Sequence, residues 1–115
     1  MIEATVSILG TEYQIEYRDP GEDKNLGENN DGYCDFSVKL IVVVSHREEE
    51  NQIEDFASYQ KRCLRHEIIH AFMYESGLSN DWEHKPFGQE ETVVDWIALQ
   101  FPKILKVFRE VGALC

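Results

Sequence analysis

Positive charge is scarce in this chain. Eleven lysines and arginines stand against 22 aspartates and glutamates, which gives a formal net charge of −11 over 115 residues. Proteins that bind nucleic acid rely on clustered cations that contact phosphates. The shortage of such cations argues against a nucleic-acid partner and, for the same reason, against an anionic membrane surface. Solubility is the simplest role for the excess of acidic residues.

Long apolar runs and paired cysteines are also missing. The longest uninterrupted apolar run, Leu40 to Val44, is far shorter than the roughly 20 residues that span a bilayer. No basic segment followed by an apolar run opens the chain, so no secretory signal is visible. Cys34, Cys63 and Cys115 are odd in number and form no C-x-x-C pair, which is typical of reduced thiols. We therefore expect a cytoplasmic protein.

The first half of the chain has the patterns of a small β-sheet. Residues 4–9 and 13–17 alternate apolar with polar residues, and Gly10-Thr11 between them suits a type II′ turn, so residues 1–18 are predicted to form a hairpin. Asp19 to Gly32 is a polar connection whose acids do not match the offsets of an EF-hand. The run 38–44 suits a strand covered on both faces, or a sheet edge beside a groove.

The second half is predicted to be helical. Asn51, with Glu54 three residues later, is suited to cap a helix over residues 52–76, which Gly77 would end. A further helix is expected over residues 89–100, and Pro102 indicates a separate or kinked helix over 103–111. At this length we expect one domain, residues 1–115, of α+β class.

One stretch of the central helix points to chemistry: His66-Glu67-Ile68-Ile69-His70. Residues four apart lie on one helical face, so both imidazoles can reach one ion. Zinc binds imidazole nitrogens readily, and a catalytic zinc site has three protein ligands and one open position for water. Glu67 is suited to accept a proton from that water. The pattern is the H-E-x-x-H arrangement of zinc metallopeptidases.

A third ligand is expected from the start of the following helix, where Glu90 and Glu91 are adjacent. Adjacent helical residues point about 100° apart, so only one of the two is expected to face the metal. Glu91 has Asp95 four residues later on its own face, and a carboxylate there can accept the free N–H of a metal-bound histidine. This favours Glu91 as the ligand and Asp95 as its neighbour that orients the histidine.

The motif and the downstream Glu91-Thr92-Val93-Val94-Asp95 together resemble the H-E-x-x-H plus E-x-x-x-D pattern of the gluzincins, the thermolysin-type metallopeptidases. The compact order of elements looks like the minimal single-domain zincins of bacteria and phages, including relatives of the ImmA/IrrE and SprT-like families. The resemblance covers roughly residues 33–100. It implies a zincin-like fold in which a small antiparallel or mixed sheet packs on a long motif helix followed by C-terminal helices.

The resemblance also implies one Zn²⁺ ion with His66, His70 and Glu91 as ligands and Glu67 as general base in peptide hydrolysis. The chain departs from the gluzincin pattern at Glu90, where gluzincins commonly have asparagine, and it has no propeptide and no second lobe. The expected substrate is a polypeptide, which the strand 38–44 would bind by strand addition. His84 or Tyr74 would donate to the developing oxyanion.

Simpler interpretations stand beside these. His84 also reads as a loop histidine, and Tyr74 as a core or rim tyrosine. Glu67-Ile68-Ile69-His70 is also the E-x-x-H half-motif of di-iron bundles, but those need two such motifs on four helices. The alternative that is not an enzyme is a zinc-stabilised interaction domain, phage- or prophage-encoded, whose site binds a partner without hydrolysing it.

Overall fold

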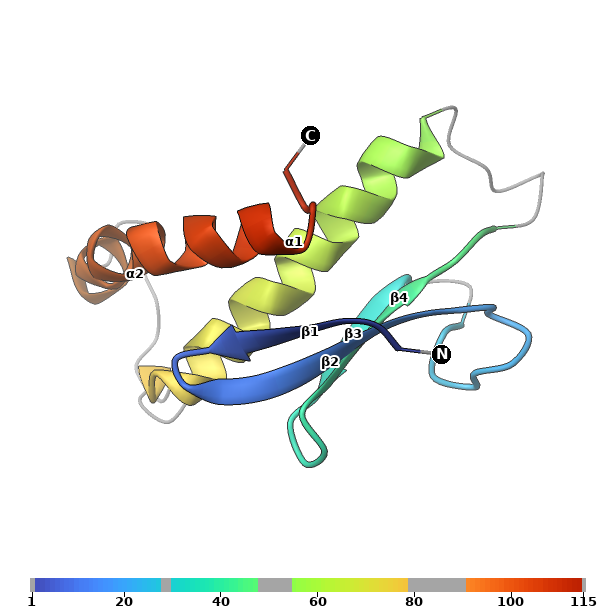
Figure 1. The fold of residues 1–115 in the computed structure, drawn as a ribbon, viewed down its shortest axis with the longest axis horizontal. Coiled ribbons are helices and arrows are strands. Elements are labelled where there is room, and N and C mark those ends of the chain that lie inside the picture. The colour runs from blue at the N-terminus through green and yellow to red at the C-terminus, as the bar shows by residue number, and fades with distance from the viewer. Residues whose placement is uncertain (1, 28–29, 48–54, 79–90, 115) are drawn as a thin grey trace.

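The computed structural model describes residues 2–27, 30–47, 55–78 and 91–114. Four strands precede two helices: β1 (Ile2–Ile8), β2 (Thr11–Arg18), β3 (Gly32–Asp35), β4 (Leu40–Val44), α1 (Phe56–Glu75) and α2 (Glu91–Glu110). The strands form a mixed sheet in the order β1-β2-β4-β3, in which only β2 and β4 are parallel. Both helices lie on one side of this sheet (Figure 1). The predicted α+β class is confirmed.

The first two strands form the predicted hairpin, but with a different turn. Ile8 pairs with Thr11, so Leu9 and Gly10 are the two loop residues. Both have positive φ, 51° and 89°. This is the combination of a type I′ turn, whose twist matches that of the flanking strands, and the predicted type II′ turn over Gly10 and Thr11 is wrong. The register places Val6 opposite Tyr13 on the buried face of the sheet.

The strand predicted over residues 38–44 is β4, which begins two residues later than expected, at Leu40. β3 and β4 are separated by a turn over residues 36–39, in which Lys39 has a φ of 58°. β4 pairs with β2 on one side and β3 on the other, so it lies inside the sheet. Residues 41–44 are completely buried, which agrees with a strand covered on both faces and excludes the alternative of a sheet edge.

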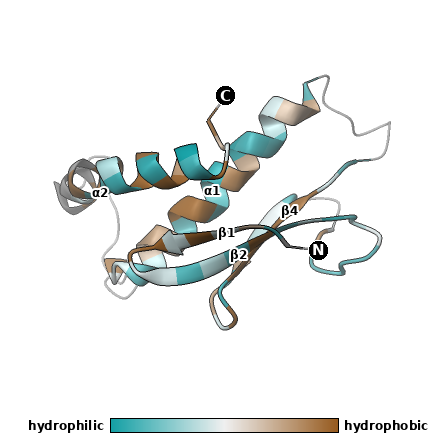
Figure 2. Ribbon diagram, viewed as in Figure 1, coloured by the Kyte–Doolittle hydropathy of each residue, from teal (hydrophilic) through white to brown (hydrophobic). Residues whose placement is uncertain are grey.

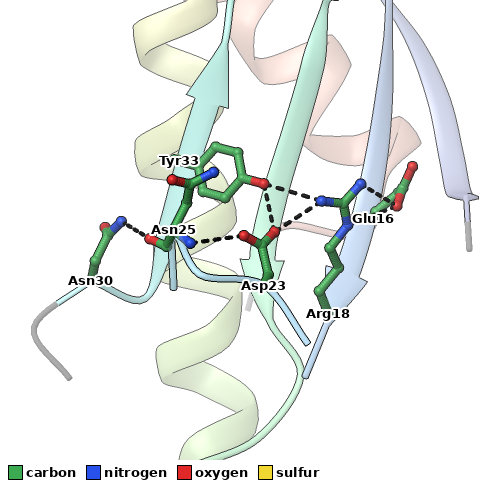
Figure 3. A network of polar contacts seen from close by, with 6 residues as sticks. All are labelled: Glu16, Arg18, Asp23, Asn25, Asn30 and Tyr33. Atoms are coloured by element: carbon green, nitrogen blue, oxygen red, sulfur yellow. Dashed lines mark hydrogen bonds and ion pairs between the residues drawn. The ribbon is translucent and has the colours of Figure 1, made fainter. Parts of the chain in front are cut away.

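The connection between β2 and β3 covers the face of the sheet that lies away from the helices. Leu26 is buried there, and Asp23 joins the sheet through two hydrogen bonds. Arg18 donates to the Asp23 carboxylate over 2.9 Å, and the Tyr33 hydroxyl donates to it over 2.6 Å (Figure 3). The hydrogen bonds from Tyr33 and Arg18 outweigh the effect of burial and lower the pKa of Asp23. The connection thus contributes buried side chains to the fold.

Asp55 caps α1, because its carboxylate accepts a hydrogen bond from the Ser58 N–H over 3.2 Å. The cap expected from the sequence, Asn51 with Glu54, lies outside the described residues. Gly77, with a φ of 86°, follows the helix end as expected. The buried face of α1 packs on the sheet through Leu64, Glu67, Ile68, Ala71 and Phe72. Each large apolar side chain among these stabilises the fold by about 1.5–3 kcal/mol.

The C-terminal part is one helix, α2, with Pro102 inside it, and not two separate helices. Figure 1 shows its first turns nearly end-on and its later turns running across the view, so the helix changes direction along its length. Ile104, Val107 and Phe108 are buried against the core. Figure 2 shows brown and teal bands alternating along α2, as expected of a helix with one apolar face. The packing of these three residues stabilises the part of the helix that follows the proline. Among the described residues, neither α1 nor α2 is apolar enough along its length to cross a membrane.

Candidate metal centre

The two motif histidines lie together on an exposed face of α1. His66 and His70 are four residues apart, and their Nε2 atoms are 3.1 Å from each other. The ring centroids are 4.7 Å apart with an interplanar angle of 71°. Two ligands held 2.0–2.1 Å from one tetrahedral zinc ion are separated by about 3.3–3.4 Å. The same distance also suits an N–H···N hydrogen bond, so the geometry fits a shared metal ion without requiring one.

The protonation state of His70 suits metal binding. Partial burial of its ring, and then the charge of His66, lower the pKa of His70. The neutral imidazole is the form that binds a metal ion. His70 is therefore available as a ligand at neutral pH.

Glu67 lies on the neighbouring face of the helix, turned toward the sheet. Only 8% of its surface is exposed. Burial raises the pKa of its carboxyl group to about 7. A buried carboxylate with a pKa near neutrality is typical of a general base, because it can both take up and release a proton at working pH.

A pocket of about 400 Å³ adjoins His66 and Glu67 and extends toward the start of α1. Asp31 on its rim is held in place because Arg47 donates to it over 2.6 Å and the Tyr59 hydroxyl donates to its other oxygen. The hydrogen bond to Asp31 raises the pKa of Tyr59, and burial adds to the effect. The lining residues are Asn30, Asp31, Gly32, Tyr59, Arg62, Cys63, His66 and Glu67.

The sheet edge beside this pocket is β3, and the expectation that strand 38–44 receives a peptide is wrong. β4 already has a strand on each side. The Asp31 carbonyl accepts from the Val44 N–H over 2.9 Å. By the alternation of antiparallel pairs, the backbone N–H and C=O groups of Gly32 and Cys34 then point away from β4. In the described part of the chain, these are the backbone groups available next to Glu67.

Tyr74 follows His70 by one helical turn and is 40% exposed. Its ring stacks on Phe36 with centroids 4.3 Å apart, and the Lys39 ammonium lies 4.8 Å from the ring centroid. Both contacts are to the ring and hold it beside the turn between β3 and β4. The tyrosine is a rim residue and is not among the residues that line the pocket beside His66 and Glu67.

The remaining predicted site residues fall where side chains are not described. Glu91 is the first residue of α2 and Asp95 lies one turn later, but only their backbone is described. Glu90 and His84 lie outside the described residues. Among the side chains that the structure describes, no group of three or more potential metal ligands occurs. The Trp96 indole N–H donates to the Ser76 hydroxyl over 2.8 Å, which joins the first half of α2 to the end of α1.

Several pocket residues were not singled out by the sequence. Tyr59 and Cys63 precede His66 by seven and three residues, so helical spacing back from the motif would have found them. Gly32 and Asp31 carry no such signal, because they reach the site through the packing of β3 on α1. Cys34 and Cys63 are free thiols, as expected, while Cys115 lies outside the described residues. Burial, and then the charge of Glu67, raise the pKa of the Cys34 thiol to about 12.

Comparison of the chain with protein-family models, with curated proteins and with solved structures finds no match in any of the three.

Proposed function

We propose that this chain is a zinc-dependent metallopeptidase in which Glu67 is the general base. The observation that carries the proposal is a pair of histidine nitrogens 3.1 Å apart beside a buried glutamate that shares a pocket with His66. A nitrogen pair at this spacing on one helix fits two of the three protein ligands of a catalytic zinc site.

The proposed ligands are His66, His70 and Glu91, with Glu90 as the alternative third ligand. Glu91 opens α2, and the hydrogen bond between Trp96 and Ser76 ties that helix to the helix of the histidines. Asp95, one turn after Glu91, is proposed to accept the second ring N–H of a ligating histidine and so fix its orientation.

Zinc in such a site supplies Lewis acidity and lowers the pKa of a bound water from 15.7 to about 7. Beside the bound ion Glu67 would be ionised, and its carboxylate would accept the proton of the attacking water. Glu67 would then return this proton to the leaving amine, a role that typically contributes about 10²–10⁴-fold to the rate. Tyr74 or His84 is the proposed donor to the developing oxyanion.

The substrate is proposed to be an extended polypeptide that pairs with the free edge of β3. The outward N–H and C=O groups of Gly32 and Cys34 offer the hydrogen bonds of strand addition next to Glu67. The excess of acidic residues favours a neutral or basic polypeptide.

A zinc ion that only stabilises the domain is less well supported. Structural zinc sites commonly replace a hydrophobic core in small domains. Here the sheet and both helices share a core that includes Ile15, Ile41, Ile68 and Val107, whereas His66 and His70 are exposed. A core of this kind favours a fold that forms without a metal ion at the histidines.

Zinc binding and cleavage by single-residue variants test the proposal. The wild-type protein should bind one zinc ion, and His66→Ala should weaken its binding at least about 100-fold. His46→Ala is the matched control, because it also removes an exposed histidine but not a proposed ligand. His46 Nε2 lies 3.7 Å from Asp19 Oδ1. Glu67→Gln should keep the metal and lose about 10²–10⁴-fold in the cleavage rate of unfolded casein. A wild-type protein without zinc, or unchanged cleavage by Glu67→Gln, would show the proposal to be wrong.

A comparison of Glu90→Ala with Glu91→Ala tests the third ligand separately. Glu91→Ala should weaken zinc binding by at least about tenfold more than Glu90→Ala. Equal losses would contradict the assignment of Glu91.

A further inference from the structure

Gly32 faces the Glu67 carboxylate across the gap between β3 and α1. A Cβ atom on Gly32 would lie 3.3 Å from Glu67 Oε2 and 3.4 Å from its Cγ. The same atom would lie 3.0 Å from the Val42 carbonyl oxygen. The contacts with the two oxygen atoms are tighter than ordinary van der Waals contacts of a Cβ atom. A side chain at position 32 therefore requires both the Val42 carbonyl and the Glu67 carboxylate to shift by a few tenths of an ångström.

The backbone conformation of β3 does not explain the glycine. Positive φ values occur at Gly10, Gly77 and Gly112, whereas Gly32 has a φ that any residue can adopt. A glycine inside a strand weakens that strand and often marks a close approach of another group. At Gly32 two groups approach the backbone: the carbonyl oxygen of Val42 and, from α1, the carboxylate of Glu67.

We propose that Gly32 is a positioning residue for Glu67, and that the missing side chain lets the carboxylate lie against β3 at the wall of the candidate pocket. The catalytic consequence rests on the proposed function, but the steric relation between the two residues does not. Gly32 and Glu67 both line the pocket with His66, so a methyl group at position 32 displaces the carboxylate within the site. The flexible side chain of Glu67 yields more easily than the backbone at Val42.

A stability cycle tests the contact without reference to activity. Gly32→Ala should lower Tm by roughly 4–12 °C, as expected for overpacking in a domain of this size. In a Glu67→Ala background, which removes both Oε2 and Cγ, the same substitution should lower Tm by less, because only the contact with the Val42 carbonyl oxygen remains. Gly27→Ala is the matched control, because no atom lies within 4 Å of its Cβ position. Equal losses in the two backgrounds would overturn the proposal.

The stability cycle still tests the contact between Gly32 and Glu67 if the Gly32→Ala protein is too unstable to fold. A folded Gly32→Ala/Glu67→Ala protein would then support the contact with Glu67. If the double variant also fails to fold while Glu67→Ala folds, the contact with Val42 is the dominant one and the proposal is wrong.

Kinetics of the zinc-loaded protein test the positioning role. A displacement of a few tenths of an ångström should lower kcat roughly tenfold. The zinc Kd should change by less than about threefold, because Gly32 contacts neither histidine ligand in this account. A wild-type kcat in Gly32→Ala would overturn the proposal. If the wild-type protein itself neither binds zinc nor cleaves casein, the proposed function fails, and the Tm cycle still decides the relation between Gly32 and Glu67.

Discussion

Replacing Glu67 by glutamine should make the metal-free protein more stable than the wild type by an amount that grows with pH. Burial raises the pKa of Glu67 from its ordinary value of 4.5 to about 7. Below pH 4.5 the carboxyl group carries a proton in both the folded and the unfolded chain. As the pH rises toward 7, the unfolded chain loses this proton first, so the folded state loses stability. Glutamine does not ionise, so the Glu67→Gln protein does not lose this stability as the pH rises.

The size of the effect follows from the difference between the two pKa values. One pKa unit corresponds to about 1.4 kcal/mol, so the change from 4.5 to about 7 amounts to about 3 kcal/mol. Because Glu67 is 8% exposed, solvent screens this cost little. The free energy of unfolding of Glu67→Gln minus that of the wild type should thus rise by about 3 kcal/mol between about pH 4 and pH 8.

Urea unfolding of both proteins in chelator, followed by circular dichroism over this pH range, measures the difference directly. Glu75→Gln on the same helix is the control, with the opposite sign. Burial acts to raise the pKa of Glu75, but hydrogen bonds from Tyr13 (2.7 Å), Lys39 (3.0 Å) and Thr11 (3.0 Å) hold it below its ordinary value. Glu75→Gln should therefore lose stability relative to the wild type as the pH rises. A pH-independent difference for Glu67→Gln would refute the reasoning.

Three further predictions concern the fold and the metal. Pro102→Ala restores an N–H group inside α2 and should raise the free energy of unfolding in urea by about 1–3 kcal/mol; a decrease would mean that the proline is required. Gly10→Ala should lower it by about 1 kcal/mol because φ is 89°, and no loss relative to Gly27→Ala would contradict the turn. Chelation of zinc should lower Tm but leave the circular dichroism spectrum at 25 °C unchanged, and unfolding would favour a structural metal ion.

The parts of the fold that depend on local pattern follow from the sequence. Alternation in the first 18 residues predicts the hairpin, and the apolar spacing around Leu64, Ile68 and Phe72 predicts α1. The proximity of His66 and His70 follows from the geometry of any α-helix. These features need no knowledge of what packs against them.

The errors occur where tertiary packing or backbone strain decides. Leu9 has a positive φ in the hairpin turn, and nothing in the sequence pattern indicates a positive φ at a leucine. Lys39, also at positive φ, ends the turn between β3 and β4, so the strand begins at Leu40 and lies inside the sheet between β2 and β3. The approach of Gly32 to Glu67 arises only when β3 packs on α1. Such contacts join residues far apart in the chain and leave no periodic pattern.

X-ray absorption at the zinc edge tests the central claim most directly, because it reports the atoms around the metal in solution. The zinc-loaded protein should show two imidazole nitrogens and carboxylate or water oxygens at about 2.0–2.2 Å, and His70→Ala should remove one imidazole. A sulfur ligand at about 2.3 Å, or a wild-type spectrum with fewer than two imidazoles, would contradict a zinc site built on His66 and His70.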